Sequence, residues 1–95
     1  MSKVIGLIRI IEPTAFEAYR GEVGRTVAEF GGRIRFRGSV TQVFWNELGC
    51  EGFEAVVELE FERLEDAQAW ATSESYRTLL EVRSRAMRVT LFAAE

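Results

Sequence analysis

The chain has 95 residues, of which 47% are hydrophobic and 28% are charged. These proportions are ordinary for a globular protein and argue against disorder or low-complexity structure. Twelve basic and fifteen acidic residues give a net charge of −3, which argues against a nucleic acid partner, because phosphate binders normally carry a basic excess. The chain contains no histidine, which excludes histidine general bases and most transition-metal sites.

Cys50 is the only cysteine, so an intrachain disulfide and a thiolate zinc cluster are excluded. The apolar stretch from Val4 to Ile11 is too short to span a bilayer, contains Arg9 and lacks the cleavage pattern of a secretory signal. No calcium-loop spacing is present among the acidic residues. We therefore expect a cytoplasmic protein with one domain, 1–95, no cofactor, no metal and no membrane partner.

A strand is predicted over 3–11, where β-branched residues dominate and both faces are mostly apolar. A helix should follow, since Thr14 and Glu17 fit a capping box directly after a proline. Apolar and aromatic residues then recur at three- and four-residue steps, which indicates one buried helical face. They are Phe16, Tyr19, Val23, Val27 and Phe30. The Gly31-Gly32 pair should end this helix, because glycine accepts the left-handed conformation there.

The rest of the chain alternates strand and helix patterns. In order, these are a strand over 33–45 with a break near Gly38, a polar loop over 46–52, a strand over 53–61, a short helix over 64–71, a second helical piece from the cap residue Ser73 to about Ala86, and a strand over 87–93. This βαββαβ order predicts an α+β, ferredoxin-like fold, with a four-stranded antiparallel sheet and the helices on one face.

The period of two along each strand sorts the sheet residues into two faces. The predicted helix-facing set is apolar: Gly6, Ile8, Ile10, Ile34, Phe36, Ala55, Val57, Leu59, Val89 and Leu91. The predicted open face mixes apolar and charged residues: Ile5, Leu7, Arg9, Arg33, Arg35, Arg37, Glu54, Val56, Glu58, Glu60, Thr90 and Phe92. An apolar patch of this kind usually marks an interface.

Arginines and glutamates should face one another across the second and third strands of this open face. Turning back through the loop puts Arg33 near Glu60, Arg35 near Glu58 and Arg37 near Val56 or Glu54. One interpretation is a solvated charged ladder. The other is the floor of a cavity under a second subunit, where guanidinium groups would hold a carboxylate, phenolate or enolate.

Segments along nearly the whole sequence resemble the domain of unknown function 1330 family, in the dimeric α/β-barrel (ferredoxin-like) superfamily. They are Glu12-Pro13 with Phe16 and Tyr19, Gly31-Gly32-Arg33, Arg37-Gly38, Glu60-Phe61, Ala67 with Trp70, Ser73 with Tyr76, and Arg83. The chain departs from the family pattern at Glu12, Ser39, Ala71 and the stretch from Ser73 to Tyr76. The resemblance implies a homodimer whose two sheets pack face to face through the open face. Superfamily relatives include cofactor-free monooxygenases, polyketide cyclases, dehydratases and isomerases.

Four residues are the main candidates for chemistry. Arg37 is the first candidate for a ligand contact, with pairing to a strand glutamate as its alternative. Glu58 and Glu60 are candidates for a general base, or else salt-bridged strand carboxylates. Tyr76 would donate a proton or a hydrogen bond to a cavity, or would pack in the core.

Four further residues are candidate ligand contacts. Trp70 either packs in the core or borders the site, and Arg83 is either a surface charge or an anion contact near the mouth of the cavity. Arg9 lies on the predicted open face. Trp45 forms either a lid or a dimer contact with its neighbour Phe44.

Three functional hypotheses remain open. The first is a cofactor-independent enzyme, cyclase-, isomerase- or monooxygenase-like, acting on a small organic or polyketide-like acid. The second is a non-catalytic dimeric binding module for a small acidic or aromatic metabolite. The third is a subunit interface with no pocket.

Overall fold

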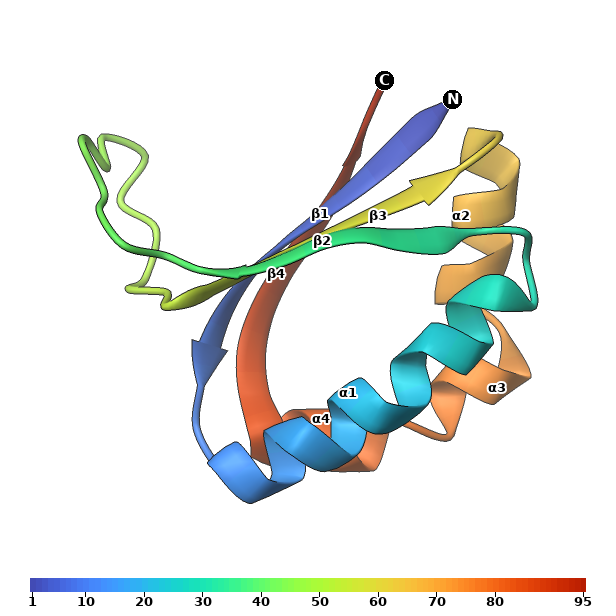
Figure 1. Ribbon diagram of the computed structural model, residues 1–95, viewed down its shortest axis with the longest axis horizontal. Helices are drawn as coiled ribbons and strands as arrows, with labels where there is room; N and C mark the ends of the chain where they lie inside the picture. The colour runs from blue at the N-terminus through green and yellow to red at the C-terminus, as the bar shows by residue number, and fades with distance from the viewer.

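A computed structural model describes all residues, 1–95. The elements are β1 (Ser2–Ile10), α1 (Pro13–Ala28), β2 (Arg33–Ser39), β3 (Ala55–Phe61), α2 (Leu64–Ala71), α3 (Glu74–Arg77), α4 (Leu80–Ala86) and β4 (Met87–Ala94). The four strands form one antiparallel sheet in the order β2-β3-β1-β4. All four helices lie on one side of this open sheet, and the other side is uncovered (Figure 1). The predicted α+β, ferredoxin-like fold is confirmed.

Helix α1 begins two residues earlier than the capping-box pattern predicts. Glu12 occupies the N-cap position with an extended backbone and makes no capping hydrogen bond through its side chain, so the prediction of a box at Thr14 is wrong. Pro13 stands in the first turn, where its missing N–H is not needed by the helix. The helix ends as predicted: Gly31 has a φ of 75°, and the N–H of Gly32 donates to the carbonyl of Val27 at 3.1 Å.

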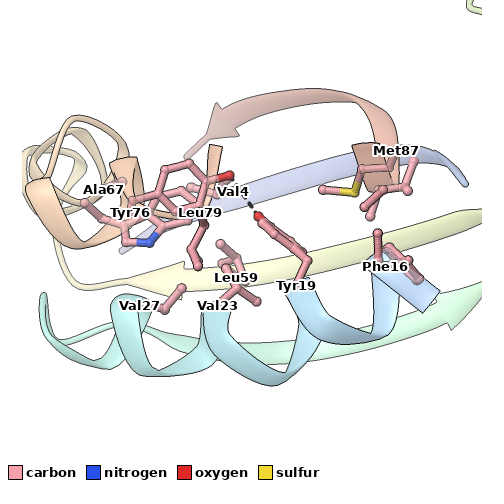
Figure 2. Close-up of a cluster of buried hydrophobic side chains, with 14 of the residues drawn as sticks. Val4, Phe16, Tyr19, Val23, Val27, Leu59, Ala67, Tyr76, Leu79 and Met87 are labelled. Atoms are coloured by element: carbon pink, nitrogen blue, oxygen red, sulfur yellow. Dashed lines mark hydrogen bonds between the residues drawn. The ribbon is translucent and has the colours of Figure 1, made fainter. Parts of the chain in front are cut away.

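The core lies between the helices and the sheet. The buried cluster combines the predicted stripe of α1 with residues of β1, β3 and the C-terminal helices, as Figure 2 shows. Trp70 is among the most buried side chains, and its indole N–H donates to Thr26 Oγ1 at 3.0 Å. This hydrogen bond ties α2 to α1. None of the four helices is long and apolar enough to cross a membrane.

A bulge in β2 changes which side chains face the core. The register shifts at Arg35, so that Phe36 pairs with Glu58 and Arg37 pairs with Val57. Paired residues share a face of the sheet, and an inserted residue exchanges the two faces for everything that follows it. Two predictions are therefore wrong: Phe36 lies on the open face, where it is 55% exposed, and Arg37 lies on the helix side.

The residue after Arg37 accommodates this bulge. A Cβ atom built on Gly38 would come within 2.5 Å of the ring of Phe36, so only glycine leaves room for the ring in this position. Strand β2 ends soon afterwards, at Ser39 rather than at residue 45. Residues 40–54 then form a long connection that projects beyond the end of the sheet (Figure 1).

Candidate functional site

A cavity of about 630 Å³ lies between α1 and the helix-facing side of the sheet. This volume suits a small organic ligand, since ligand sites commonly measure roughly 300–1,000 Å³. Most of the lining is apolar, and it includes Ile8, Phe16, Val23, Ile34, Val57 and Leu91. The sequence predicts a possible ligand site on the open face, whereas this cavity is on the opposite side of the sheet.

Two tyrosine hydroxyls belong to the polar part of the cavity wall. The hydroxyl oxygens of Tyr19 and Tyr76 are 2.8 Å apart, and the Nη1 atom of Arg83 donates to the hydroxyl of Tyr76 at 3.0 Å. Tyr19 comes from α1 and points toward Tyr76 of α3, as the dashed line in Figure 2 marks. Burial, and secondarily the neighbouring Tyr76, raise the pKa of Tyr19 well above its ordinary value. Tyr19 therefore stays neutral and retains its proton.

Arg37 brings a positive charge to the cavity from β2. Its Nη2 atom donates to the backbone carbonyl of Arg20 at 3.2 Å, and both residues line the cavity. Arg20 itself pairs with Glu17 at 2.9 Å, but no carboxylate lies within 4.0 Å of the Arg37 guanidinium. The predicted alternative, a pairing of Arg37 with a strand glutamate, is not formed. The exposed guanidinium is thus available to an anionic ligand.

Glu58 and Glu60 lie on the open face and do not line the cavity. Glu58 accepts a hydrogen bond from Lys3 at 2.6 Å. Glu60 lies 3.4 Å from Arg33 Nε, which confirms the predicted pairing of these two residues. The predicted pairing of Arg35 with Glu58 is wrong, because the bulge shifts the register and Arg35 Nε lies 4.0 Å from Glu60 instead. The role of either glutamate as a general base stays a prediction, and the sheet separates both carboxylates from the cavity.

Arg9 and Trp45 also lie away from the cavity. Arg9 Nη1 donates to Glu51 at 3.0 Å, and Arg88 binds the same carboxylate at 2.9 Å. These two arginines fasten the 40–54 connection to the sheet. Trp45 stands on that connection and is 81% exposed. No group of three or more His, Cys, Asp or Glu side chains is arranged to hold a metal ion.

The structure thus brings four of the predicted site residues together. Arg37, Trp70 and Tyr76 line the cavity, and Arg83 reaches it through the hydroxyl of Tyr76. Tyr19 is a polar cavity residue outside the predicted site. Its signal was present, because it is the one member of the α1 stripe with a polar tip, but the pattern alone assigns such a residue to the core.

A family model described as a domain of unknown function, DUF1330, matches residues 4–95. The chain belongs to this family. No curated protein matches this DUF1330 chain.

Solved structures show the same fold at low sequence identity. The RPA0582 protein of unknown function from Rhodopseudomonas palustris is 16% identical, with a TM-score of 0.79 over 98% of this chain and 79% of that one. SnoaB from Streptomyces nogalater, described as a cofactor-independent oxygenase, is 5% identical, with a TM-score of 0.69 over 99% of this chain and 90% of that one. A dimeric protein of unknown function and ferredoxin-like fold from Bacteroides fragilis is 14% identical, with a TM-score of 0.59 over 99% and 94%. Likeness at these identities establishes the fold alone.

Proposed function

We propose that this DUF1330 protein is a homodimer that takes a small organic acid into the cavity between α1 and the sheet, and acts on it as a cofactor-independent enzyme of the cyclase, isomerase or monooxygenase type. One observation carries the proposal. An apolar cavity of about 630 Å³ combines an ion-pair-free guanidinium, that of Arg37, with the buried hydroxyls of Tyr19 and Tyr76. Such a wall suits a molecule with an apolar body and an acidic group.

Arg37 is the proposed contact for the acid. A guanidinium presents a planar fork of N–H donors that matches a carboxylate in two parallel hydrogen bonds. Strand β2 supplies this group to the cavity only because the bulge at Arg35 exchanges the faces of the sheet. The hydrogen bond from Arg37 to the carbonyl of Arg20 fixes its orientation without neutralising its charge.

The enzymatic part of the proposal draws on Tyr76 and on fold likeness. Arg83 donates to Tyr76, and the hydrogen-bonded pair of Tyr76 and Tyr19 is placed to donate one hydrogen bond or proton to a ligand. SnoaB, of similar fold, is described as a cofactor-independent oxygenase, which supports this class of reaction by analogy.

A non-catalytic binding module is the second candidate, and the carboxylates of the cavity favour it. Glu17 is paired with Arg20 at 2.9 Å, and Glu54 Oε1 accepts from the backbone N–H of Ile10 at 2.5 Å. No other carboxylate lines the cavity. A binding protein needs no general base, whereas an enolising enzyme does.

The dimer is proposed to form through the open face of the sheet. Phe36 and Phe92 are 55% and 46% exposed there, and Ile5, Leu7 and Val56 are half-buried around them. Burying these side chains against a second copy would remove apolar surface from water. The similar Bacteroides fragilis protein is described as dimeric.

The ligand proposal is tested with 2-naphthoate and its uncharged counterpart 2-naphthamide. We expect naphthoate, but not the amide, to raise the melting temperature, and Arg37→Gln to abolish the effect. The matched control is Arg25→Gln, which removes an arginine of α1 that binds Glu22 and does not line the cavity. An equal response of the Arg37 and Arg25 variants, or no response of the wild type, would contradict an acid site at Arg37.

A proton-exchange experiment distinguishes an enzyme from a binding protein. The acetyl methyl group of 6-acetyl-2-naphthoate exchanges with deuterium oxide through its enol, and NMR follows the loss of its signal. An enzyme of the proposed type accelerates this exchange, whereas a binding module leaves it at the buffer rate. Glu60→Gln should slow it only if the predicted base acts from the open face.

The dimer is tested by sedimentation at micromolar concentration. Phe36→Ser should shift the protein toward the monomer, because it removes an exposed aromatic side chain of β2 from the proposed interface. Leu80→Ser is the control, since Leu80 is 41% exposed on α4, on the helix side of the molecule. A wild-type monomer would refute the dimer, and equal effects of both variants would refute this interface.

A further inference from the structure

One hydroxyl hydrogen in the cavity wall has no hydrogen-bond acceptor within the protein. Tyr19 and Tyr76 each carry one hydroxyl hydrogen, and one of the two is used in the hydrogen bond between them. Arg83 is always protonated and can only donate, so it takes up no hydrogen from Tyr76. No other protein acceptor lies within hydrogen-bond distance of either hydroxyl. One donor therefore remains for a molecule in the cavity.

The charge of Arg83 decides which hydroxyl keeps the free hydrogen. Because Arg83 donates to the Tyr76 oxygen at 3.0 Å, it draws electron density from that phenol and makes Tyr76 the stronger donor. Tyr76 then donates to Tyr19, and Tyr19 is left with a hydrogen that has no protein acceptor. The hydrogen bonds thus run in one direction: Arg83 donates to Tyr76, and Tyr76 donates to Tyr19.

The buried, mostly apolar surroundings of the two hydroxyls limit which ligand group can accept this hydrogen bond. Tyr19 is 8% and Tyr76 4% exposed, and Val23 and Leu59 line the cavity beside them. A carboxylate would leave several lone pairs unsatisfied in such a place, which costs free energy. A single ketone or enolate oxygen on an apolar body needs little more than one strong donor. Burial raises the pKa of Tyr19, so the phenol keeps its proton in the cavity.

We propose that Tyr19 donates a hydrogen bond to a ketone or enolate oxygen of the ligand, with Arg83 and Tyr76 as positioning residues that strengthen the donor. The inference rests on the proposed cavity function and narrows its ligand class to oxo acids, with the acid at Arg37 and the ketone at Tyr19. No bond to carbon forms or breaks in this step, and the proton stays on Tyr19.

The test compares 6-acetyl-2-naphthoate with 6-ethyl-2-naphthoate, which has the same acid and ring system but no ketone. We expect the wild type to bind the acetyl compound about tenfold more tightly, as one buried hydrogen bond allows. Tyr19→Phe should abolish this preference while leaving the affinity for the ethyl compound unchanged. Thermal denaturation of each variant, and its affinity for the ethyl compound, show whether the fold is intact.

The positioning role of Arg83 and Tyr76 is tested by a separate measurement. The infrared stretching frequency of the bound ketone should be lowered in the wild type, and should rise again in Arg83→Met and Tyr76→Phe. Arg83→Lys, which keeps a cationic donor, should restore part of the lowering. A ketone frequency that is unchanged in the Arg83 and Tyr76 variants would refute the proposal that these two residues strengthen the donor at Tyr19.

The outcomes separate the two proposals. If the wild type binds both compounds equally, or if Tyr76→Phe rather than Tyr19→Phe removes the preference, the assignment to Tyr19 is wrong while the acid site stands. If Arg37→Gln leaves the affinity for both compounds unchanged, the assignment of the acid site to Arg37 is wrong. The preference of the wild type for the acetyl compound, and its loss in Tyr19→Phe, then tests the assignment of Tyr19 by itself. If neither compound binds, both proposals fail.

Discussion

Trp70 of α2 and Thr26 of α1 are joined by a buried hydrogen bond, in which the indole N–H donates to Thr26 Oγ1 at 3.0 Å. The same hydroxyl donates onward to the carbonyl of Val23 at 2.7 Å. Thr26 is fully buried, so the bond is sealed from water. The two helices are thereby held in one register behind the cavity, which Trp70 also lines.

Thr26→Val should lower the free energy of unfolding by about 1–3 kcal/mol, because it leaves the buried indole N–H without an acceptor at nearly constant volume. Urea denaturation measures the change. In a Trp70→Phe background, which has no indole donor, the same substitution should cost less. An equal cost in both backgrounds would show that the hydrogen bond does not contribute to stability.

Two glycines should respond in opposite directions to alanine. A Cβ atom on Gly32 would lie 2.5 Å from the ring of Phe61, whereas one on Gly21, in α1, meets nothing within 4 Å. Gly32→Ala should therefore destabilise the protein by about 1–3 kcal/mol through overpacking. Gly21→Ala should stabilise it by about 0.5–1 kcal/mol, because alanine is the better helix former. Chemical denaturation of both variants tests the pair, and the same sign for both would contradict the geometry.

Stability should fall at alkaline pH because of Tyr19. Its pKa in the folded protein is raised above the ordinary value of 10.0 by burial and by Tyr76. Above pH 10 the unfolded chain loses this proton while the folded chain keeps it, so unfolding becomes easier by about 1.4 kcal/mol per pH unit. Below pH 10 both states keep the proton and the contribution is constant.

Denaturation of wild type and Tyr19→Phe from about two units below to about one unit above the ordinary tyrosine pKa checks this effect. The variant should show a shallower decline above pH 10, since its other ionisable groups are the same. Parallel curves would mean that Tyr19 ionises as readily in the folded state as in the unfolded chain.

The 40–54 connection should become mobile when the ion pairs that hold it to the sheet are removed. Glu51 binds both Arg9 and Arg88, and the hydrogen bond from Arg88 is the main cause of the lowered pKa of Glu51. Glu51→Gln should speed proteolytic cleavage of the connection, which limited digestion with mass spectrometry detects. Glu47→Gln, in the same segment but without an ion pair, should cleave at the wild-type rate. Cleavage that is unchanged in Glu51→Gln would mean that other contacts hold the segment.

Much of the sheet follows from local patterns in the sequence. The alternation over 53–61 fixes which side of β3 meets the helices, because successive side chains of a strand point to opposite faces. The stripe of α1 and its end at Gly31 follow from helical periodicity and from the glycine conformation in the same way. The pairing of Arg33 with Glu60 was also predictable, since a connection back to the neighbouring strand leaves few registers.

The cavity wall depended on tertiary contacts that no local pattern encodes. Strict alternation assigned Phe36 to the core and Arg37 to the open face, but the bulge at Arg35 exchanged them, because a single unpaired residue reverses the faces of all that follow. Tyr19 and Tyr76 are 57 positions apart in the sequence, and only packing of α3 against α1 brings their hydroxyls together. The sequence by itself determined the fold and its apolar layer. The tertiary structure decided which side of β2 presents Arg37, and it brought the tyrosine hydroxyls of α1 and α3 to the same cavity.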